Sequence, residues 1–350
     1  MNIIVINPGA TSTKLAYWQN DKPLHTTTIQ YTNDEVCQFE TIAQQLDMRF
    51  QDIKHTLESW AIDLKGVDGI AARGGLLKPL KSGGYEINET MLDDLKNRPR
   101  NHHAANLGAP MAWLLQKETH HAKAYIYDPV TVDELEPISR ISGLCGIERE
   151  SLGHMLNTRA IAKRVAQDLN QDFNNSTYIV AHLGGGNTTA IFVNGRLVDL
   201  LSDDEGPFST ERTGALPVKK VIQWCQNHSY ETMMRLYRQQ GGLYSYLKTN
   251  DLREVQRRID EQDKEARLIF EAMAYQIAKG IGQLAVVNYG QVDRIVLTGG
   301  VAYSKQMVSL ITKRVEFLAE VTVYPGEMEM EALYQGVNRI LKGEKAHEYI

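Results

Sequence analysis

The stretch that decides the fold runs from Asn2 to Tyr17 and reads NIIVINPGATSTKLAY. It consists of an apolar strand, a turn of small polar residues and a second strand. The same plan returns between Tyr178 and Leu200, in YIVAHLGGGNTTAIFVNGRLVDL, which runs on through the strong hairpin signal Asn194-Gly195. Strands joined by such short turns pair antiparallel, so neither copy is the strand–crossover–strand unit of a dinucleotide-binding domain. A repeat spaced by about half the chain therefore predicts two domains built on one plan.

Amphipathic helices fill much of the remaining sequence. Apolar spacing predicts helices over 107–117, 156–169, 266–287, 305–318 and 328–341. The segment 266–287 is apolar over a wide arc, which is typical of a helix in a core or between domains. No low-complexity linker separates the halves, so ordered structure must cross the boundary. We expect one domain over 1–150 plus 328–350 and a second over 151–327.

Composition places the chain among ordinary soluble globular proteins, with 43% hydrophobic and 23% charged residues over 350 positions. The net charge of −5 argues against a nucleic-acid partner, and no apolar run reaches the roughly 18 residues of a membrane span. The N-terminus lacks the basic leader of a signal peptide. Three scattered cysteines, Cys37, Cys145 and Cys225, form no CxxC pair, which fits a reduced cytosol and disfavours structural zinc. A cytoplasmic protein without membrane or nucleic-acid partners is expected.

The common nucleotide and metal motifs are missing. There is no GxxxxGK[ST] loop, and Gly184-Gly185-Gly186 does not extend to GxGxxG. There is no HExxH, and the doublets His102-His103 and His120-His121 have no metal-ligand context.

Three glycine-containing turns offer another route to a phosphate site. The turn NPGATSTK at 7–14 supplies hydroxyls, backbone N–H groups and one lysine, although a plain hairpin loop is rich in the same residues. The turn HLGGGNTT at 182–189 has three consecutive glycines, which are best tolerated where another atom approaches the main chain. A third loop, Thr298-Gly299-Gly300, follows a strand. Together these loops resemble the three nucleotide contacts of the actin-like ATPase fold.

Eight blocks are spread along the whole chain: NPGATSTKLA (7–16), AARGGLLKPL (71–80), NHHAANLGAP (101–110), YDPVTVDELEPISRISG (127–143), AHLGGGN (181–187), DEGPFSTERTGALPV (204–218), LTGGVAYS (297–304) and YPGEMEMEAL (324–333). With these blocks the chain resembles the acetate and butyrate kinases, which belong to the superfamily of actin, Hsp70 and sugar kinases. Its ISGL (141–144) and GPFSTERTG (206–214) resemble butyrate kinases more than acetate kinases. The resemblance implies an α/β protein of two duplicated actin-like (ribonuclease H-like) domains with a nucleotide cleft between them.

The resemblance assigns residues to ATP and its phosphates. Ala10 stands where acetate kinases have a serine, a loss for which Thr11 is a candidate replacement, and Gly185 stands where they have an asparagine. The implied ATP and phosphate contacts are Asn7, Ser12, Lys14, His182, Gly184, Gly185, Gly186, Gly299 and Gly300.

It also assigns catalytic and metal residues. Glu329 matches a magnesium-linked glutamate, with Glu327 and Glu331 as competitors, and Asn7 joins it as a metal residue. A further family histidine falls on His102 or His103, and the choice stays open. The implied catalytic residues are Arg73 and Arg212 at the transferring phosphoryl group, Asp128, and His154.

Elementary chemistry supports cationic groups in these roles. A carboxylic acid with a pKa of about 4 to 5 is already ionised at neutral pH, so it needs no general base to attack. The obstacle is the repulsion between a carboxylate and a polyphosphate, which arginine forks can offset. Arg73 follows the apolar run 69–72 and precedes Gly74-Gly75, a strand end of the kind at which α/β proteins bind ligands. Asp128 is harder to explain as a base, so magnesium-bound water or an arginine is its expected partner.

The expected activity is reversible, Mg²⁺-dependent phosphoryl transfer between ATP and butyrate or a similar C4 acid, which gives an acyl phosphate. An acetate, propionate or branched-chain acid kinase is the nearest alternative, and a non-catalytic actin-like ATP-binding protein is an alternative of another class. The expected partners are the short-chain carboxylate and further copies of the chain, as a homodimer or higher homo-oligomer.

Overall fold

The computed structural model describes residues 1–350, which divide into two compact units. The first comprises Met1–Asp133 with Met328–Ile350, and the second comprises Glu134–Glu327. The sequence pattern predicts the first boundary near residue 150, whereas the segment 134–150 packs with the second unit. Its backbone and side chains bind β9, since the Glu136 N–H donates to the Val198 carbonyl at 3.1 Å and Arg149 pairs with Asp199 at 2.9 Å.

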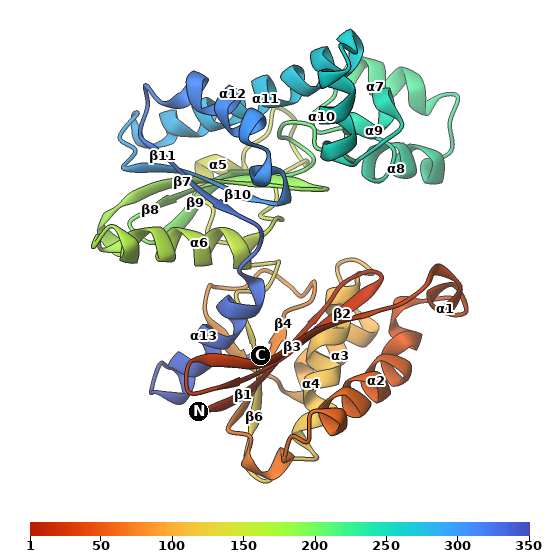
Figure 1. Cartoon of the computed structure of the whole chain (residues 1–350), viewed down its shortest axis with the longest axis vertical. Helices are drawn as coiled ribbons and strands as arrows, with labels where there is room; N and C mark the ends of the chain where they lie inside the picture. The colour runs from red at the N-terminus through yellow and green to blue at the C-terminus, as the bar shows by residue number, and fades with distance from the viewer. The chain divides into compact units, whose positions relative to one another are not determined.

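The first unit is a mixed six-stranded sheet in the order β3-β2-β1-β4-β6-β5 (Figure 1). Its strands are β1 (Asn2–Pro8), β2 (Ser12–Gln19), β3 (Lys22–Gln30), β4 (Gly69–Arg73), β5 (Gly84–Glu86) and β6 (Lys123–Tyr127). Its helices are α1 (Asn33–Cys37), α2 (Leu46–Ser59), α3 (Glu89–Asn97), α4 (Gly108–Gln116) and α13 (Glu329–Leu341), with 3₁₀ turns at Ile42–Gln45, Leu64–Gly66 and Ala104–Leu107.

The second unit is a mixed five-stranded sheet in the order β11-β10-β7-β8-β9. Its strands are β7 (Thr177–Leu183), β8 (Asn187–Val193), β9 (Arg196–Leu201), β10 (Arg294–Gly299) and β11 (Val321–Pro325). Its helices are α5 (Pro137–Arg140), α6 (Met155–Asp168), α7 (Val218–Cys225), α8 (Tyr230–Arg238), α9 (Gly242–Leu247), α10 (Leu252–Asp260), α11 (Lys264–Ala285) and α12 (Lys305–Val315), with 3₁₀ turns at Phe173–Asn175, Val286–Asn288 and Gly300–Tyr303.

The two sheets share one plan, as the repeated hairpin predicts. In the first unit β1 pairs antiparallel with β2 and parallel with β4, and β4 pairs parallel with β6. In the second unit β7 pairs antiparallel with β8 and parallel with β10, and β10 pairs parallel with β11. The hairpin predicted at Asn194-Gly195 is also confirmed, because both residues have positive φ and join β8 to antiparallel β9.

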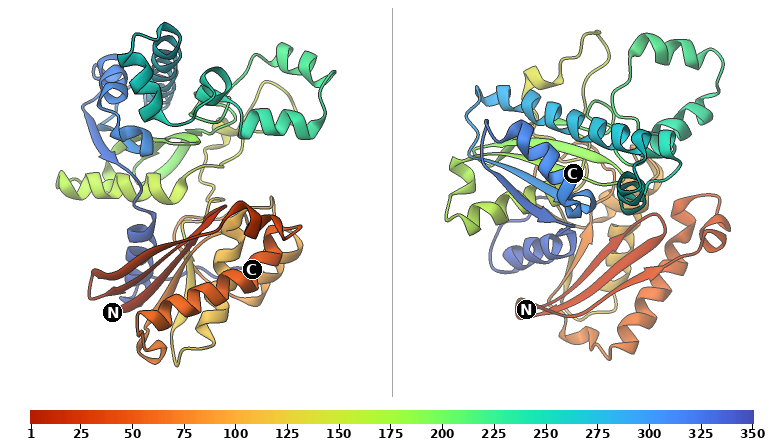
Figure 2. Two further views of the ribbon diagram at one scale, coloured as in Figure 1. Left: turned by 45° about the vertical axis from the view of Figure 1, so that its right-hand side comes forward. Right: turned by 45° about the horizontal axis from the view of Figure 1, so that its top comes forward.

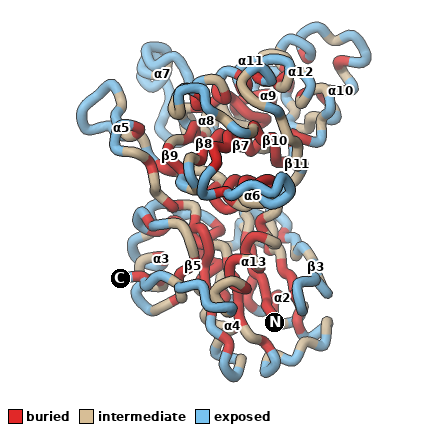
Figure 3. Tube along the Cα trace, turned by 90° about the vertical axis from the view of Figure 1, so that its left-hand side faces the viewer, coloured by how far each residue is buried: buried red, intermediate tan, exposed pale blue.

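Helices cover both faces of each sheet, so the central strands are buried on both sides (Figures 2 and 3). This burial explains the unbroken apolar runs of β1 and β7, since strands covered on both faces do not alternate with polar residues. In the second unit α11 packs in the core with Phe270, Met273 and Ile277 at 0% exposure. The predicted wide-arc helix at 266–287 is therefore a core helix. None of the helices is long and apolar enough to cross a membrane.

Helix α13, near the end of the chain, contacts strand β2 and the turn that follows it. Tyr334 stacks on Trp18 with ring centroids 4.2 Å apart and donates its hydroxyl to Asp21 at 2.7 Å. Asn338 donates to the same carboxylate at 2.9 Å. The Tyr334 hydrogen bond lowers the pKa of Asp21 and keeps the carboxylate ionised as an acceptor. These contacts hold α13, whose first residue is Glu329, against β2 and the β2–β3 turn.

Candidate functional site

Three candidate residues of the first unit lie at one edge of its sheet. Asn7 is near the end of β1, Arg73 ends β4, and Asp128 follows β6 directly. The register pairs Ile6 with Ala72 and Arg73 with Tyr127, so the three strands end side by side. The carboxyl ends of parallel strands are where α/β proteins usually bind ligands.

Asn7, Arg73 and Glu329 contact one another at this edge. The Asn7 Nδ2 donates to Glu329 Oε2 at 2.8 Å, and Arg73 Nη1 lies 3.4 Å from both Glu329 Oε2 and Asn7 Oδ1. Asn7 and Glu329 are only 3% and 5% exposed. Of the competing glutamates, Glu327 is exposed and Glu331 accepts a hydrogen bond from Gln335 at 2.8 Å. Glu329 is thus the one that these contacts join to Asn7.

Asp128 is buried, and the backbone of Gly83, the residue directly before β5, binds it through two hydrogen bonds. Its Oδ1 accepts from the Gly83 N–H at 2.7 Å, and its own N–H donates to the Gly83 carbonyl at 3.0 Å. Its φ of +41° lies in the left-handed region, which few residues with a side chain adopt, although Asp tolerates it better than most. The Gly83 N–H thus orients the carboxylate, and the backbone hydrogen bond holds the residue itself in place.

The first candidate phosphate loop connects β1 to β2. Ser12 begins β2, and Lys14 stands opposite Asn7 in the antiparallel register. The Gly9 N–H donates to the Ser12 carbonyl at 2.7 Å, which closes the turn.

The two adjacent histidines differ in surroundings. His103 caps the 3₁₀ turn Ala104–Leu107, because its Nδ1 accepts from the Ala105 N–H at 3.0 Å. His102 is exposed, and its backbone N–H binds the Asn101 side chain at 2.8 Å. The structure gives His103 a capping role, and the choice between the two histidines for chemistry stays open.

In the second unit, two candidate histidines stack on each other. The rings of His154 and His182 have centroids 4.0 Å apart at an interplanar angle of 12°. His154 Nδ1 lies 2.9 Å from Thr188 Oγ1, and His182 Nδ1 lies 2.8 Å from Asn157 Nδ2. His182 is in β7 and His154 directly precedes α6, so the stack joins the start of that helix to the glycine-rich turn.

The turn Gly184–Gly186 packs against a carboxylate that holds Arg212. A Cβ on Gly186 would lie 2.6 Å from Asp203 Oδ1, so this position has no room for a side chain. The other oxygen of Asp203 accepts a hydrogen bond from Arg212 Nη1. Burial raises the pKa of Asp203, and the Arg212 charge opposes that rise. Asp203 was missed in the sequence, where it stands one residue before the block 204–218.

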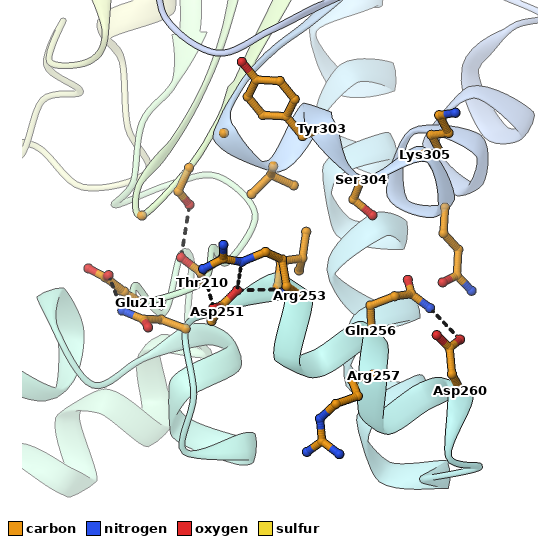
Figure 4. A pocket seen from close by; sticks show the side chains of 17 residues that line it. Thr210, Glu211, Asp251, Arg253, Gln256, Arg257, Asp260, Tyr303, Ser304 and Lys305 are labelled. Carbon is orange, nitrogen blue, oxygen red and sulfur yellow. Dashed lines mark hydrogen bonds and ion pairs between the residues drawn. The ribbon is translucent and has the colours of Figure 1, made fainter.

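The second and third glycine loops open on one pocket of about 1200 Å³ within the second unit (Figure 4). Gly184, Gly185 and Gly300 line it, and nothing lies within 4 Å of the position that a Cβ on Gly300 would take. Gly299 does not line the pocket, and its φ of +88° and the close approach of the Leu183 carbonyl leave no room for a side chain. The pocket has room for a nucleoside. Most of its other polar lining residues come from α10, α12 and the residues just before these helices, and they include Asn250, Asp251, Arg253, Gln256, Arg257, Ser304 and Lys305; Thr210 and Glu211 line it from the loop after β9.

Asn7 and Glu329 suit a magnesium ion that is also bound by the phosphates of a nucleotide. Mg²⁺ usually takes one or two protein carboxylates, and substrate phosphates and water complete its shell. Glu329 supplies one carboxylate and Asn7 one amide oxygen, whereas no cluster of three or more His, Cys, Asp or Glu side chains forms a dedicated cage. The site fits a nucleotide-borne ion held by these two residues.

Comparison with known proteins places the chain in a family. The Acetokinase family matches residues 148–333, which is more than half of the chain. The chain belongs to the acetokinase family. Members of this family are phosphotransferases that use ATP and act on carboxylates.

Solved structures show the same fold over the whole of this acetokinase-family chain. An acetate kinase from Porphyromonas gingivalis matches with a TM-score of 0.80 at 18% identity, covering 97% of this chain and 99% of that one. A propionate kinase from Francisella tularensis subsp. tularensis SCHU S4 matches with a TM-score of 0.79 at 18% identity, covering 96% and 98%. A ROK family protein from Streptococcus pneumoniae TIGR4 matches more distantly, with a TM-score of 0.53 at 15% identity and coverage of 98% and 100%. The expected α/β architecture of two actin-like sheets is confirmed.

Binding of Mg·ATP is expected to slow amide hydrogen exchange in both glycine-rich turns, 8–14 and 183–188, because backbone N–H groups that bind phosphate exchange slowly. The hairpin turn Asn194-Gly195 is the matched control, since it joins β8 to β9 and does not line the pocket. Its exchange should not change. Protection of only one of the two glycine-rich turns would contradict the prediction that both hairpins bind phosphate.

Proposed function

We propose that this protein is a short-chain fatty acid kinase that transfers the γ-phosphoryl group of ATP reversibly to butyrate or a similar C4 acid. Family membership supports the carboxylate as acceptor. The C4 preference rests on the resemblance of ISGL (141–144) and GPFSTERTG (206–214) to butyrate kinases. In the reaction a carboxylate oxygen forms a bond to the γ-phosphorus, the bridging P–O bond breaks, and ADP leaves with the electron pair.

The proposal rests on an arrangement that both units have. In each unit, one arginine beside the glycine-rich hairpin is paired with a carboxylate. Arg73 pairs with Glu329 at 3.4 Å, and Arg212 pairs with Asp203. Both substrates of the proposed reaction are anions, so positioned cations are what it needs most. A guanidinium that is already held in place loses little freedom when it binds a phosphoryl oxygen, and its planar fork can serve two oxygens at once.

The other candidate residues receive roles from the same chemistry. No general base is needed, so Asp128 orients an arginine or a magnesium-bound water and does not remove a proton. His154 donates a hydrogen bond to the transferring group, with its ring fixed by His182 and Thr188. Asn7 and Glu329 hold Mg²⁺, which supplies positive charge to the phosphates when it is bound.

Nucleotide contacts are proposed in each unit. Ser12, Lys14 and Asn7 bind phosphate in the first unit. In the second unit His182 and Gly184–Gly186 bind phosphate, while Gly299 and Gly300 and the pocket of α10 and α12 receive the adenosine.

Chain-length selectivity is expected to be modest, and a hydroxamate assay of acyl-phosphate formation across C2 to C6 acids measures it. Butyrate has two more methylenes than acetate, and at about 0.8 kcal/mol each their burial gains roughly 1.6 kcal/mol. This corresponds to about fifteen-fold in kcat/KM, with branched C4 acids also accepted and acids beyond about C6 excluded by size.

A preference for acetate or propionate would instead assign the chain to those kinases, and a preference for a branched acid would refine the C4 assignment. Mg·ATP binding without turnover of any acid would favour a non-catalytic ATP-binding protein.

Replacement of Arg73 or Arg212 by alanine is expected to lower kcat by roughly 10²-fold or more with little change in Tm, because each acts mainly on the transition state. Lysine should rescue poorly, since it lacks the fork. Arg294→Gln is the matched control, because Arg294 pairs with Glu320 at the opposite end of β10 from Gly299, and its kcat should be unchanged. A large loss of stability with normal turnover in the Arg73 or Arg212 variants would identify structural ion pairs.

Self-association through the α7–α8 hairpin is proposed as the basis of a homodimer. Neither helix has a buried residue, and Val218, Ile222, Trp224 and Tyr230 are 53–74% exposed. Beside them is an apolar groove of about 390 Å³ that Trp224 and Tyr246 line. The exposed parts of Trp224, Tyr230 and Tyr246 offer roughly 400 Å², about half of what each partner contributes to a stable interface. The aliphatic residues of the same face add to this area, and a second copy brings an identical face.

Light scattering coupled to size exclusion should find a dimer or larger assembly that Ile222→Asp or Trp224→Asp converts to smaller species. Phe317→Asp changes an 80% exposed apolar residue elsewhere in the second unit and should leave the assembly intact. A monomeric parent protein, or equal effects of all three substitutions, would refute the proposed interface.

A further inference from the structure

Arg49 is a fully buried arginine that binds the first phosphate loop from behind. It lies in the first turn of α2 at 0% exposure, among Phe50, Ile53 and Leu57 on the apolar face of that helix. A charged residue at a buried helical position is costly unless its hydrogen bonds are satisfied. The hydrogen-bond partners of Arg49 therefore indicate why an arginine occupies this buried position.

The guanidinium binds three carbonyl groups of the turn between β1 and β2. Nη1 donates to the carbonyls of Gly9 at 2.8 Å and Ser12 at 3.0 Å, and Nη2 donates to that of Ala10 at 2.8 Å. Nε and Nη2 also donate to Gln45 Oε1 at 3.1 and 2.8 Å. The planar fork thus spans the loop, which a lysine ammonium cannot do.

No carboxylate is among the hydrogen-bond or ion-pair partners of Arg49. Its guanidinium carbon lies 4.5 Å from the centre of the Tyr31 ring, and its remaining polar contact is with Thr13 Oγ1 at 3.3 Å. Desolvation lowers the pKa of Arg49, yet a guanidinium remains protonated at neutral pH. A full positive charge therefore lies behind the loop, with no carboxylate in hydrogen-bond contact and with Asp52 acting on it only through its charge.

Peptide geometry converts these contacts into an orientation of the loop. In a trans peptide the C=O and the following N–H point in opposite directions. Because Arg49 holds the carbonyls of Gly9 and Ala10, the N–H groups of Ala10 and Thr11 are directed away from α2. The bound cation also polarises these peptide units, which strengthens their N–H groups as donors to an anion. Ala10 has no hydroxyl to offer, so at that position the loop must bind through its backbone.

We propose that Arg49 is a positioning residue that presets the Ala10 and Thr11 N–H groups to bind the terminal phosphates of a nucleoside triphosphate, without touching the nucleotide itself. The proposal rests on the proposed function for the identity of the anion. It makes the phosphate affinity of the first unit depend on a side chain that is hidden beneath the loop.

The test measures binding at equilibrium, by calorimetry with Mg·ATP and by competition with adenosine. Arg49→Gln and Arg49→Lys are each expected to raise the Kd for Mg·ATP at least about 10-fold and to change the Kd for adenosine less than about two-fold. Adenosine lacks phosphates, and the pocket assigned to it lies wholly in the second unit. Arg294→Gln, the control arginine paired with Glu320, should change neither constant.

Hydrogen exchange without ligand provides a second readout. Ala10 and Thr11 amides should exchange faster in Arg49→Lys than in the parent, while the turn Asn194-Gly195 should not change. Should Arg49→Gln fail to fold, Arg49→Lys keeps the charge and decides the question. A parent-like Kd for Mg·ATP in Arg49→Lys, or equal losses of ATP and adenosine affinity, would overturn the proposal.

The failure of the proposed function can be recognised separately. If the parent binds Mg·ATP but phosphorylates no C2 to C6 acid, the acceptor assignment fails while the dependence of ATP affinity on Arg49 remains measurable.

Discussion

The parallel pairing of one hairpin strand with its neighbours is the constraint on which the rest of the structure depends. Because β1 runs parallel to β4, and β4 to β6, the turn after β1, Arg73 and Asp128 all lie at one edge of the first sheet. The same pairing of β7 with β10 brings the turn Gly184–Gly186 beside Gly299 in the second sheet. A hairpin with two parallel neighbours thus gathers a glycine-rich turn and the residues at strand ends without any contact being specified separately.

A buried and a half-buried carboxylate then decide how the cations at these edges are held. Glu329 lies between Asn7 and Arg73, and Asp203 lies between the glycine turn and Arg212. Each pair is partly desolvated, so its hydrogen bonds are stronger than those of an exposed ion pair and its side chains have little freedom. Arg49 differs from these two arginines, because it is bound by backbone carbonyl groups and not by a carboxylate. A phosphate site needs both arrangements, arginines that can bind anions and a backbone that is already oriented.

Much of the fold could be predicted from local patterns. The helices predicted at 156–169 and 305–318 are present as α6 and α12, with ends shifted by a few residues, and the hairpins pair as expected. The helices of 218–260 were not predicted. The faces of α7 and α8 are exposed, so their apolar residues do not mark a buried stripe. Arg49 was also missed, although its position on the apolar face of α2 is a signal that a charged residue there has an internal partner.

What the sequence determined by itself is the duplicated strand–turn–strand plan, the glycine-rich turns and the resemblance to one kinase family, because apolar runs, turn chemistry and motif spacing are local. Only the tertiary structure decided that Glu329 and not Glu327 or Glu331 reaches Asn7, that Asp203 holds Arg212, and that the segment 134–150 belongs to the second unit. These contacts join residues that are distant in the chain, or choose between neighbours only one or two positions apart. They depend on where α13 and the loop after β9 pack, and the direction of a side chain there follows from packing and not from spacing in the chain.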